Sequence, residues 1–169
     1  IETNEENPFQ LWASEPKING ELLDKWRIFK PANKTEVTGT YGPINRIKNY
    51  KDKLFFYQDM ALGIASINER SIITDQSGQQ AVLGTGGIFP DYQYLSTITG
   101  CYHQFAVVET ENGLYHYDAR LRKLFKTGQG VQPISDMKGM SSFFDNKITG
   151  SINKEDFTLR TIDGGPTGV

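Results

Sequence analysis

Two stretches of this chain repeat one pattern, and the repeat constrains the fold more than any other feature. Residues 53–70, KLFFYQDMALGIASINER, and residues 104–120, QFAVVETENGLYHYDAR, each run from an apolar segment through a polar corner into a second apolar segment. Gly63 in the first stretch lies 50 positions before Gly113 in the second. Because polar corners with Asn and Gly favour tight turns, the pattern predicts one β-hairpin in each stretch.

A further turn is expected after each hairpin, at Asn68–Glu69 and at Asp118–Ala119. Glycine-rich segments also recur, around Gly39, Gly84 and Gly128, at intervals of about 45 residues. Periods of about 40–50 residues built from short strands are typical of β-propeller blades. The sequence therefore predicts a mainly β fold of repeated antiparallel, blade-like units of about 45 residues, arranged like part of a propeller.

These markers divide the chain into four parts. Residues 1–33 form an N-terminal arm or linker with the first strand, residues 34–80 the first β unit, residues 81–127 the second, and residues 128–169 a partial third unit. Within the arm, acidic and polar residues 1–24 are expected to lie outside the core. Strands are expected at 26–30, 45–50, 53–58, 62–67, 80–83, 93–98, 104–110, 113–117, 121–126 and 156–162, and a short helix within 135–144.

Three such units cannot close a ring, since propellers usually need at least about four blades. Open strand edges are therefore expected, and another part of a longer chain or a neighbouring subunit would cover them. The chain starts at Ile1 without a methionine and ends in a turn-rich stretch, which also indicates a fragment of a longer protein.

Charge and composition argue against several classes of protein. The net charge is -2, and the most basic segment, residues 48–53 (KNYKDK), is diluted by Asp52, so nucleic acid is a poor candidate partner. No apolar run approaches the roughly 20 residues that cross a bilayer, so no membrane association is expected. Cys101 is the only cysteine and cannot form an internal disulfide.

The residues that could carry chemistry do not form a recognisable catalytic or metal-binding motif. The glycine-rich residues 84–87 lack the Lys-Ser/Thr of a phosphate-binding loop and are interpreted as a tight connection. His103 and His116 lack the spacing of metal ligands. In a strand, the side chains of Cys101 and His103 would lie on one face and could form a reactive pair. A cysteine at such a position is more commonly a small buried residue. No catalytic, cofactor-binding or metal-binding residue is expected, and the chain is predicted not to be an enzyme.

Acidic and aromatic side chains leave alternatives open. The corner acids are interpreted as solvated turn formers, although paired carboxylates could perform acid–base chemistry or hold calcium. The clustered tyrosines are expected to be mainly core and cross-strand fillers, with a share in a protein interface or sugar site. These residues are Asp59, Asp75, Glu109 and Glu111, and Tyr92, Tyr94, Tyr102, Tyr115 and Tyr117.

The order of short motifs over residues 24–145 resembles that of a known family. The series runs Trp26-Arg-Ile-Phe29, Tyr41-Gly-Pro-Ile-Asn45, Leu54-Phe-Phe-Tyr-Gln-Asp59, Ile67-Asn-Glu-Arg-Ser71, Val82-Leu-Gly-Thr-Gly86, Gly113-Leu-Tyr115, and Lys138-Gly-Met140 with Phe143-Phe144. It is similar to the stabilisation proteins of crAss-like gut bacteriophages, which are also called tail muzzle proteins and are much longer than this chain.

The resemblance implies a structural component of the virion at the tail end, made in the cytoplasm of the bacterial host. Such a protein would hold and seal the tail through contacts with other tail proteins and with further copies or segments of itself. The resemblance implies no catalytic residue. Two other hypotheses remain: a propeller-like module that binds a host surface glycan or receptor, and a polysaccharide-cleaving enzyme, which would need two carboxylates facing one cleft.

Overall fold

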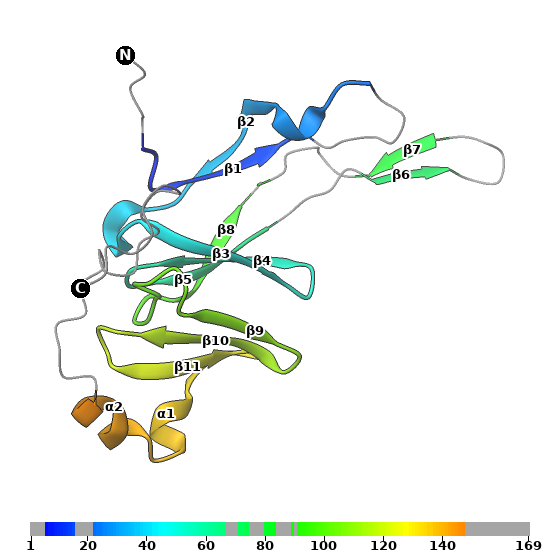
Figure 1. The fold of residues 1–169 in the computed structure, drawn as a ribbon. Helices are drawn as coiled ribbons and strands as arrows, with labels where there is room; N and C mark the ends of the chain where they lie inside the picture. The colour runs from blue at the N-terminus through cyan, green and yellow to red at the C-terminus, as the bar shows by residue number, and fades with distance from the viewer. Residues whose placement is uncertain are drawn as a thin grey trace.

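Antiparallel sheets dominate the part of the chain that the computed structural model describes, which is residues 6–15, 22–66, 71–74, 80–83, 89 and 91–147 (Figure 1). The first sheet has the order β3 (Ile44–Tyr50), β4 (Lys53–Gln58), β5 (Leu62–Ala65) and β8 (Tyr92–Ser96). The second sheet has the order β12 (Val131–Pro133), β11 (Lys123–Thr127), β10 (Gly113–Asp118) and β9 (Val107–Thr110). The prediction of a mainly β, antiparallel fold is confirmed.

Two smaller pairs of strands and several short helices complete the described fold. The small sheet pairs β1 (Gln10–Ser14) with β2 (Phe29–Glu36), and a separate hairpin pairs β6 (Ser71–Thr74) with β7 (Gln80–Leu83). The helices are η1 (Lys25–Arg27), η2 (Gly39–Tyr41), α1 (Ile134–Met137) and α2 (Ser141–Lys147). In the described part of the chain, no helix is long and apolar enough to cross a membrane.

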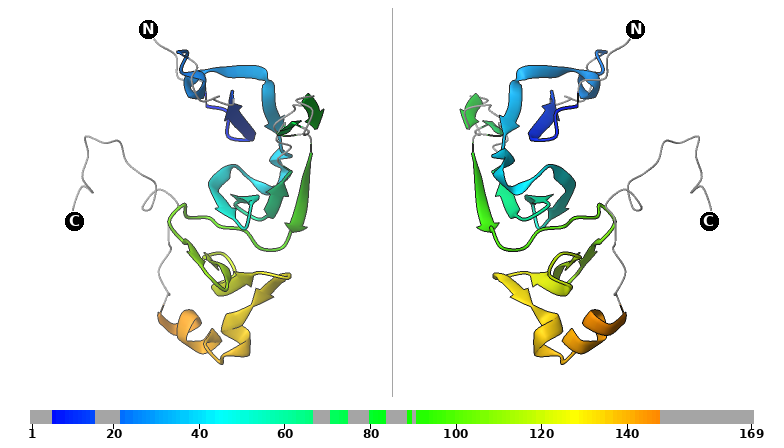
Figure 2. Two further views of the ribbon diagram at one scale, coloured as in Figure 1. Left: turned by 90° about the vertical axis from the view of Figure 1, so that its right-hand side faces the viewer. Right: turned by 90° about the vertical axis from the view of Figure 1, so that its left-hand side faces the viewer.

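The sheets are stacked as layers. The small sheet lies on one face of the first sheet, the second sheet lies on the other, and α1 and α2 lie beyond the second sheet (Figures 1 and 2). Between the two large sheets, Phe55 and Tyr57 pack with Leu62, Val107 and Leu114. This layer forms the larger of the two described core clusters.

A second core cluster fills the space between the first sheet and the small sheet. Leu11, Val37, Phe56 and Ala65 are buried there. Strand β4 therefore buries side chains on both of its faces, which explains why LFFYQ reads as a continuous run instead of an alternating one. Burial of Leu11 also shows that the prediction of a non-core segment over residues 1–24 was wrong at β1.

Gly63 in β5 permits the close packing of the first sheet. It lies opposite Phe56 in the β4–β5 ladder, and a Cβ atom on Gly63 would come within 2.1 Å of the Phe56 ring. Gly113, its counterpart at the 50-residue offset, begins β10 with a φ of 147°. Both members of the repeat therefore lie in the hairpins β4–β5 and β9–β10, as the sequence predicted.

Each large sheet is a meander of neighbouring strands, the first with the β6–β7 hairpin inserted between β5 and β8. The described residues form no closed barrel or propeller, so the propeller-like arrangement and the unit boundaries remain predictions. The strand expected at 156–162, the turn at Asn68–Glu69 and most of the glycine-rich segment around Gly84 lie outside the described residues.

Other predicted elements differ from the structure. Residues 25–27 form a 3-10 turn, so the strand expected at 26–30 begins only at Phe29. Strands β1, β6 and β12 were not predicted. The helix predicted within 135–144 is present as two short helices, separated at Gly139, whose φ of 65° ends α1.

Candidate functional site

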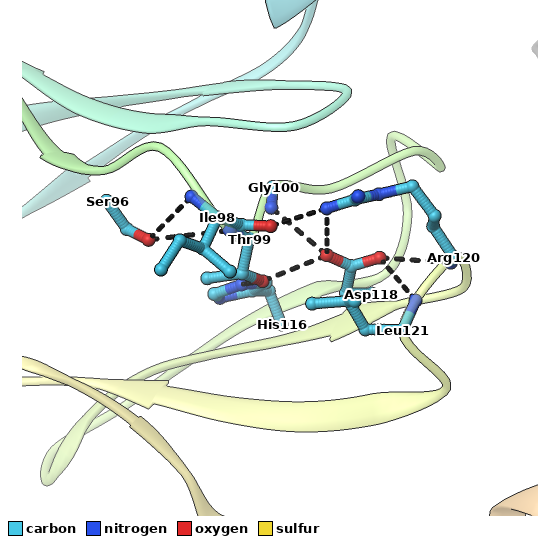
Figure 3. A network of polar contacts seen from close by, with 8 residues as sticks. All are labelled: Ser96, Ile98, Thr99, Gly100, His116, Asp118, Arg120 and Leu121. Atoms are coloured by element: carbon cyan, nitrogen blue, oxygen red, sulfur yellow. Dashed lines mark hydrogen bonds and ion pairs between the residues drawn. The ribbon is translucent and has the colours of Figure 1, made fainter.

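A buried polar cluster joins the two large sheets where the loop after β8 crosses the end of β10 (Figure 3). Its centre is the Asp118 carboxylate, which is fully buried. One carboxylate oxygen accepts hydrogen bonds from Thr99 Oγ1 at 3.0 Å and from the Gly100 amide at 3.2 Å. The other accepts from the amides of Arg120 and Leu121 at 2.9 and 3.1 Å.

The Asp118 carboxylate is therefore saturated by donors from two segments of the chain. Its own turn supplies two amides, which confirms the turn predicted at Asp118–Ala119, and the crossing loop supplies the other two donors. The Arg120 guanidinium lies 3.9 Å from the carboxylate and also donates to the carbonyl of Ile98. Burial of a charge is tolerated only with such pairing, so this cluster fixes the crossing loop on the second sheet.

His116 is the neighbour of Asp118 on the same face of β10. Its Nε2 lies 3.1 Å from Thr99 Oγ1. Because that hydroxyl already donates to Asp118, Nε2 must carry the proton and donate to the hydroxyl. Burial lowers the pKa of His116 to about 4, with the negative charge of Asp118 opposing the shift. At neutral pH the imidazole is uncharged and packs between the rings of Tyr57 and Phe125, with centroids 5.2 and 5.3 Å away.

Cys101 and His103 do not form a reactive pair. They lie in the loop between β8 and β9, so the strand arrangement that would place both side chains on one face is not present. The Cys101 thiol donates to the backbone carbonyl of His103 at 2.9 Å. Burial raises the thiol pKa to about 12, so the thiol is not poised as a nucleophile at neutral pH.

The loop around Cys101 is also bound to the first sheet. The Cys101 amide donates to the Gln58 carbonyl at 2.9 Å, and Asn45 Nδ2 donates to the Cys101 carbonyl at 2.9 Å. Gly100 passes so close to the β4–β5 corner that an added Cβ would lie 2.3 Å from the Gln58 carbonyl oxygen. The loop is thus held against the first sheet by hydrogen bonds to the loop backbone and by close backbone packing.

Gln58 forms a second buried polar centre, on the opposite face of the first sheet. Its side-chain amide donates to the carbonyls of Thr38 and Gly42 at 2.9 and 2.6 Å and accepts from the Tyr94 hydroxyl at 2.7 Å. Sequence reasoning did not single out Gln58, Thr99 or Gly100, because their partners lie 16 to 36 positions away or in another sheet.

The predicted corner acids are dispersed. Asp59 accepts a hydrogen bond from Asn45 Nδ2 at 2.6 Å, Glu109 and Glu111 are exposed in β9 and its turn, and Asp75 lies outside the described residues. Within the residues that the structure describes, no group of three His, Cys, Asp or Glu side chains could hold a metal ion.

The predicted tyrosine zone is divided between two surfaces. Tyr92 and Tyr94 pack with Phe56 against the small sheet, as predicted for core fillers, with centroids 5.9 and 5.8 Å from the Phe56 ring. Tyr115 and Tyr117 point the other way from β10, because strand side chains alternate and Leu114 and His116 face the core.

The side chains of the second sheet that point away from the first sheet form its outer face, which consists of Val108, Thr110, Tyr115, Tyr117, Leu124, Lys126 and Gln132. Val108 lies directly opposite Tyr115 and is 58% exposed. The helical segment covers part of this face: α1 contacts β11, and the Phe144 ring of α2 lies 5.3 Å from that of Tyr117, while Phe143 is 54% exposed. Exposed aliphatic and aromatic side chains grouped in this way are typical of a contact with another protein surface.

Comparison with protein families decides what kind of protein presents this surface. Residues 1–162 match the family model described as Crassvirus muzzle protein. The chain belongs to the Crassvirus muzzle protein family. A search among curated proteins found no match. The resemblance drawn from the motifs over residues 24–145 is therefore confirmed, and a muzzle protein has a structural role in the phage particle.

Proposed function

We propose that this part of the muzzle protein holds and seals the end of the phage tail by packing against neighbouring tail proteins and further copies or segments of muzzle protein. The observation that carries the proposal is the outer face of the second sheet. Val108 on this face, and Phe143, whose ring neighbours that of Phe144 beside Tyr117, are 58% and 54% exposed. Exposed apolar side chains gathered on one face are typical of surfaces that become buried on assembly.

A further antiparallel sheet of the same protein family is the occupant that fits this face best. The inner face of the second sheet is already covered in this way by the first sheet, through Tyr57 and Leu114. Apart from Lys126, the alternate positions of β10 and β11 present the same kinds of side chain, aromatic and branched, on the outer face. Sheets pack face to face at about 10 Å, so the outer face can repeat the contact that the inner face makes.

The chemistry of the buried residues supports a role without turnover. The Asp118 carboxylate is saturated by hydrogen-bond donors, the His116 ring is buried and neutral, and the Cys101 thiol has a pKa of about 12. Groups held in this way stabilise the contact between sheets and are poorly suited to act on a substrate.

Cross-linking with mass spectrometry on intact particles tests the proposal. Lys126 lies on the outer face and Lys138 is exposed between α1 and α2. A lysine-reactive reagent is expected to link both to other tail proteins or to distant muzzle segments, and the same reaction on the isolated chain identifies links within the chain. If both lysines form only internal links in the particle, the outer face is not an assembly surface and the proposal fails.

A further inference from the structure

A pocket of about 350 Å³ lies beside the outer face, where the β3–β4 turn meets the β11–β12 loop. Its lining includes Tyr50, Lys51, Asn112, Lys126, Gln129 and Gln132. We propose that this pocket binds an acidic saccharide, with Lys51 and Lys126 holding its carboxylate and the amide side chains holding its hydroxyl groups. The inference goes beyond the role in assembly and depends on different residues, apart from Lys126.

The size and charge of the pocket suit a small anionic ligand. Ligand pockets in proteins usually have volumes of about 300–1,000 Å³. Among the described residues that line this one, two carry ammonium groups and none carries a carboxylate. Glu109 and Glu111 line a neighbouring depression that shares only Tyr50 and Lys51 with the pocket. A ligand carboxylate can therefore approach both lysines without meeting a lining carboxylate.

Tyr50 gives the pocket a fixed aromatic wall. Its hydroxyl donates to the Glu111 carbonyl at 3.0 Å, which ties the β3–β4 turn to the β9–β10 turn. The Lys51 ammonium lies 5.2 Å from the centroid of the Tyr50 ring, and that of Lys126 lies 5.8 Å from the Tyr115 ring. Cation–π contacts at these distances restrict both lysines, so less side-chain entropy is lost when a ligand binds.

The uncharged lining favours a saccharide over an acidic peptide. The side chains of Asn112, Gln129 and Gln132 each offer both donors and an acceptor. Each sugar hydroxyl group both donates and accepts, so it can match such an amide side chain, whereas the side chains of an acidic peptide only accept and its donors are confined to the backbone. Gly128 and Gly130 have no atom within 4 Å of the position where a Cβ would lie, so the loop leaves room for a ring-sized ligand.

The backbone at Lys51 provides independent support. Lys51 and Asp52 form the β3–β4 turn with φ values of 49° and 59°. Two-residue hairpin turns with positive φ at both positions strongly prefer Asn-Gly, because a side chain such as that of lysine is strained there. Strained backbone positions of this kind are concentrated at ligand-binding sites, where the function of the side chain outweighs the conformational cost of the backbone. A pocket that uses the Lys51 ammonium explains why lysine occupies this position.

Saturation-transfer NMR with the purified chain tests the site directly. The ligands are trigalacturonate, its neutral counterpart galactotriose, and a hexaglutamate peptide. We expect trigalacturonate to bind, to bind more weakly as NaCl rises from about 0.05 to about 0.3 M, and to bind more tightly than either other ligand. Lys51→Asn should weaken trigalacturonate binding by about tenfold, since it removes a hydrogen bond to a charged group.

Thermal unfolding of the same variant separates loss of the site from loss of the fold. Because asparagine tolerates positive φ, Lys51→Asn should raise the Tm by about 2–4 °C while it weakens binding. Lys53→Gln removes a lysine next to the same turn but outside the pocket and should change neither the affinity for trigalacturonate nor the Tm. The proposal is overturned if the wild-type chain does not bind trigalacturonate, if Lys51→Asn binds it equally well, or if hexaglutamate binds as tightly.

Discussion

The Thr99 hydroxyl donates a hydrogen bond to the buried Asp118 carboxylate over 3.0 Å, and this contact joins the loop after β8 to the end of β10. The same hydroxyl accepts from His116, so one side chain connects a buried charge to a buried neutral ring. Hydrogen bonds as well as apolar packing therefore define the junction between the two large sheets. The residues that form these hydrogen bonds can be replaced one at a time.

Replacing Asp118 by Asn should destabilise the fold by about 2–4 kcal/mol. The carboxylate accepts on both oxygens, from Gly100 on one side and from Arg120 and Leu121 on the other. The asparagine amide has only one oxygen. Its NH₂ group must therefore face N–H donors that the second carboxylate oxygen had accepted from, and those donors lose their acceptor. Urea denaturation measures the loss.

Asp24→Asn is the matched control for Asp118→Asn. Asp24 is exposed, and its side chain makes no capping hydrogen bond to η1. Its replacement should change the free energy of unfolding by less than about 0.5 kcal/mol. Equal effects of the two substitutions would show that the donors around the Asp118 carboxylate do not stabilise the junction.

Gly63→Ala should destabilise the chain by about 1–3 kcal/mol, because its Cβ would meet the Phe56 ring at 2.1 Å in a layer that is packed on both faces. Gly128→Ala is the matched control, since no atom lies within 4 Å of its added Cβ. Thermal or urea unfolding of both variants measures the difference. A neutral result for Gly63→Ala would mean that the Phe56 ring can move away without cost.

The strands that the sequence predicted best are those with local boundary signals. The bounds 53–58 of β4 were predicted correctly, because the polar pair Lys51–Asp52 precedes its apolar run and Asp59 follows it. Strand β1 was missed, since its Leu11 becomes a core residue only through contact with a layer formed by β4 and β5. Its burial depends on Val37, Phe56 and Ala65, which lie 26 to 54 positions away, beyond any local pattern.

The buried polar cluster was predictable only in part. The turn at Asp118 follows from its residue type, because aspartate accepts hydrogen bonds from the backbone two or three residues ahead. The contribution of Thr99 could not be predicted, since an isolated threonine in a loop carries no signal that it will meet β10. Nor could the sequence distinguish the outer face of β10 from its core face. Leu114 and His116 alternate with Tyr115 and Tyr117, and both pairs contain an aromatic ring.

Stability should decrease as the pH is lowered from about 6.5 to about 4, through His116. The folded-state pKa of His116 is about 4, below the ordinary value of 6.5, because burial disfavours the charged ring. In this window the unfolded chain binds a proton that the folded chain does not, so protonation favours unfolding. The lowered pKa corresponds to a loss of roughly 3 kcal/mol in the free energy of unfolding across this pH window. Urea denaturation at a series of pH values measures the change.

His116→Gln isolates this contribution from that of the carboxylates. The glutamine amide can still donate toward Thr99, but it does not titrate. The difference in unfolding free energy between wild type and variant should therefore shrink or reverse in favour of the variant as the pH falls from 6.5 to 4. A difference that stays constant over this window would show that His116 does not carry the pH dependence.

The Cys101 thiol should react with a disulfide reagent only when the chain opens. Its side chain is fully buried, and its pKa of about 12 leaves almost no thiolate at pH 8. Modification of the native chain should be on the order of a thousandfold slower than in denaturant. In a Cys101→Ala background, Lys138→Cys places a thiol at an exposed position and should react at an ordinary rate. Rapid native modification of Cys101 would show that the loop between the sheets opens readily.

Val108→Glu should reduce self-association of the isolated chain without destabilising its fold. Val108 is 58% exposed on the outer face, so the substitution costs little folding free energy, while a carboxylate there would be buried without a partner at any contact with an apolar surface. Light scattering after size exclusion should show a shift toward the monomer, and the Tm should be unchanged. Ile98→Glu provides the control, because Ile98 is 72% exposed in the loop after β8, away from the outer face, and its replacement should leave association unaffected. If the wild-type chain is already a monodisperse monomer at high concentration, or if both variants act alike, the outer face does not drive assembly of the chain.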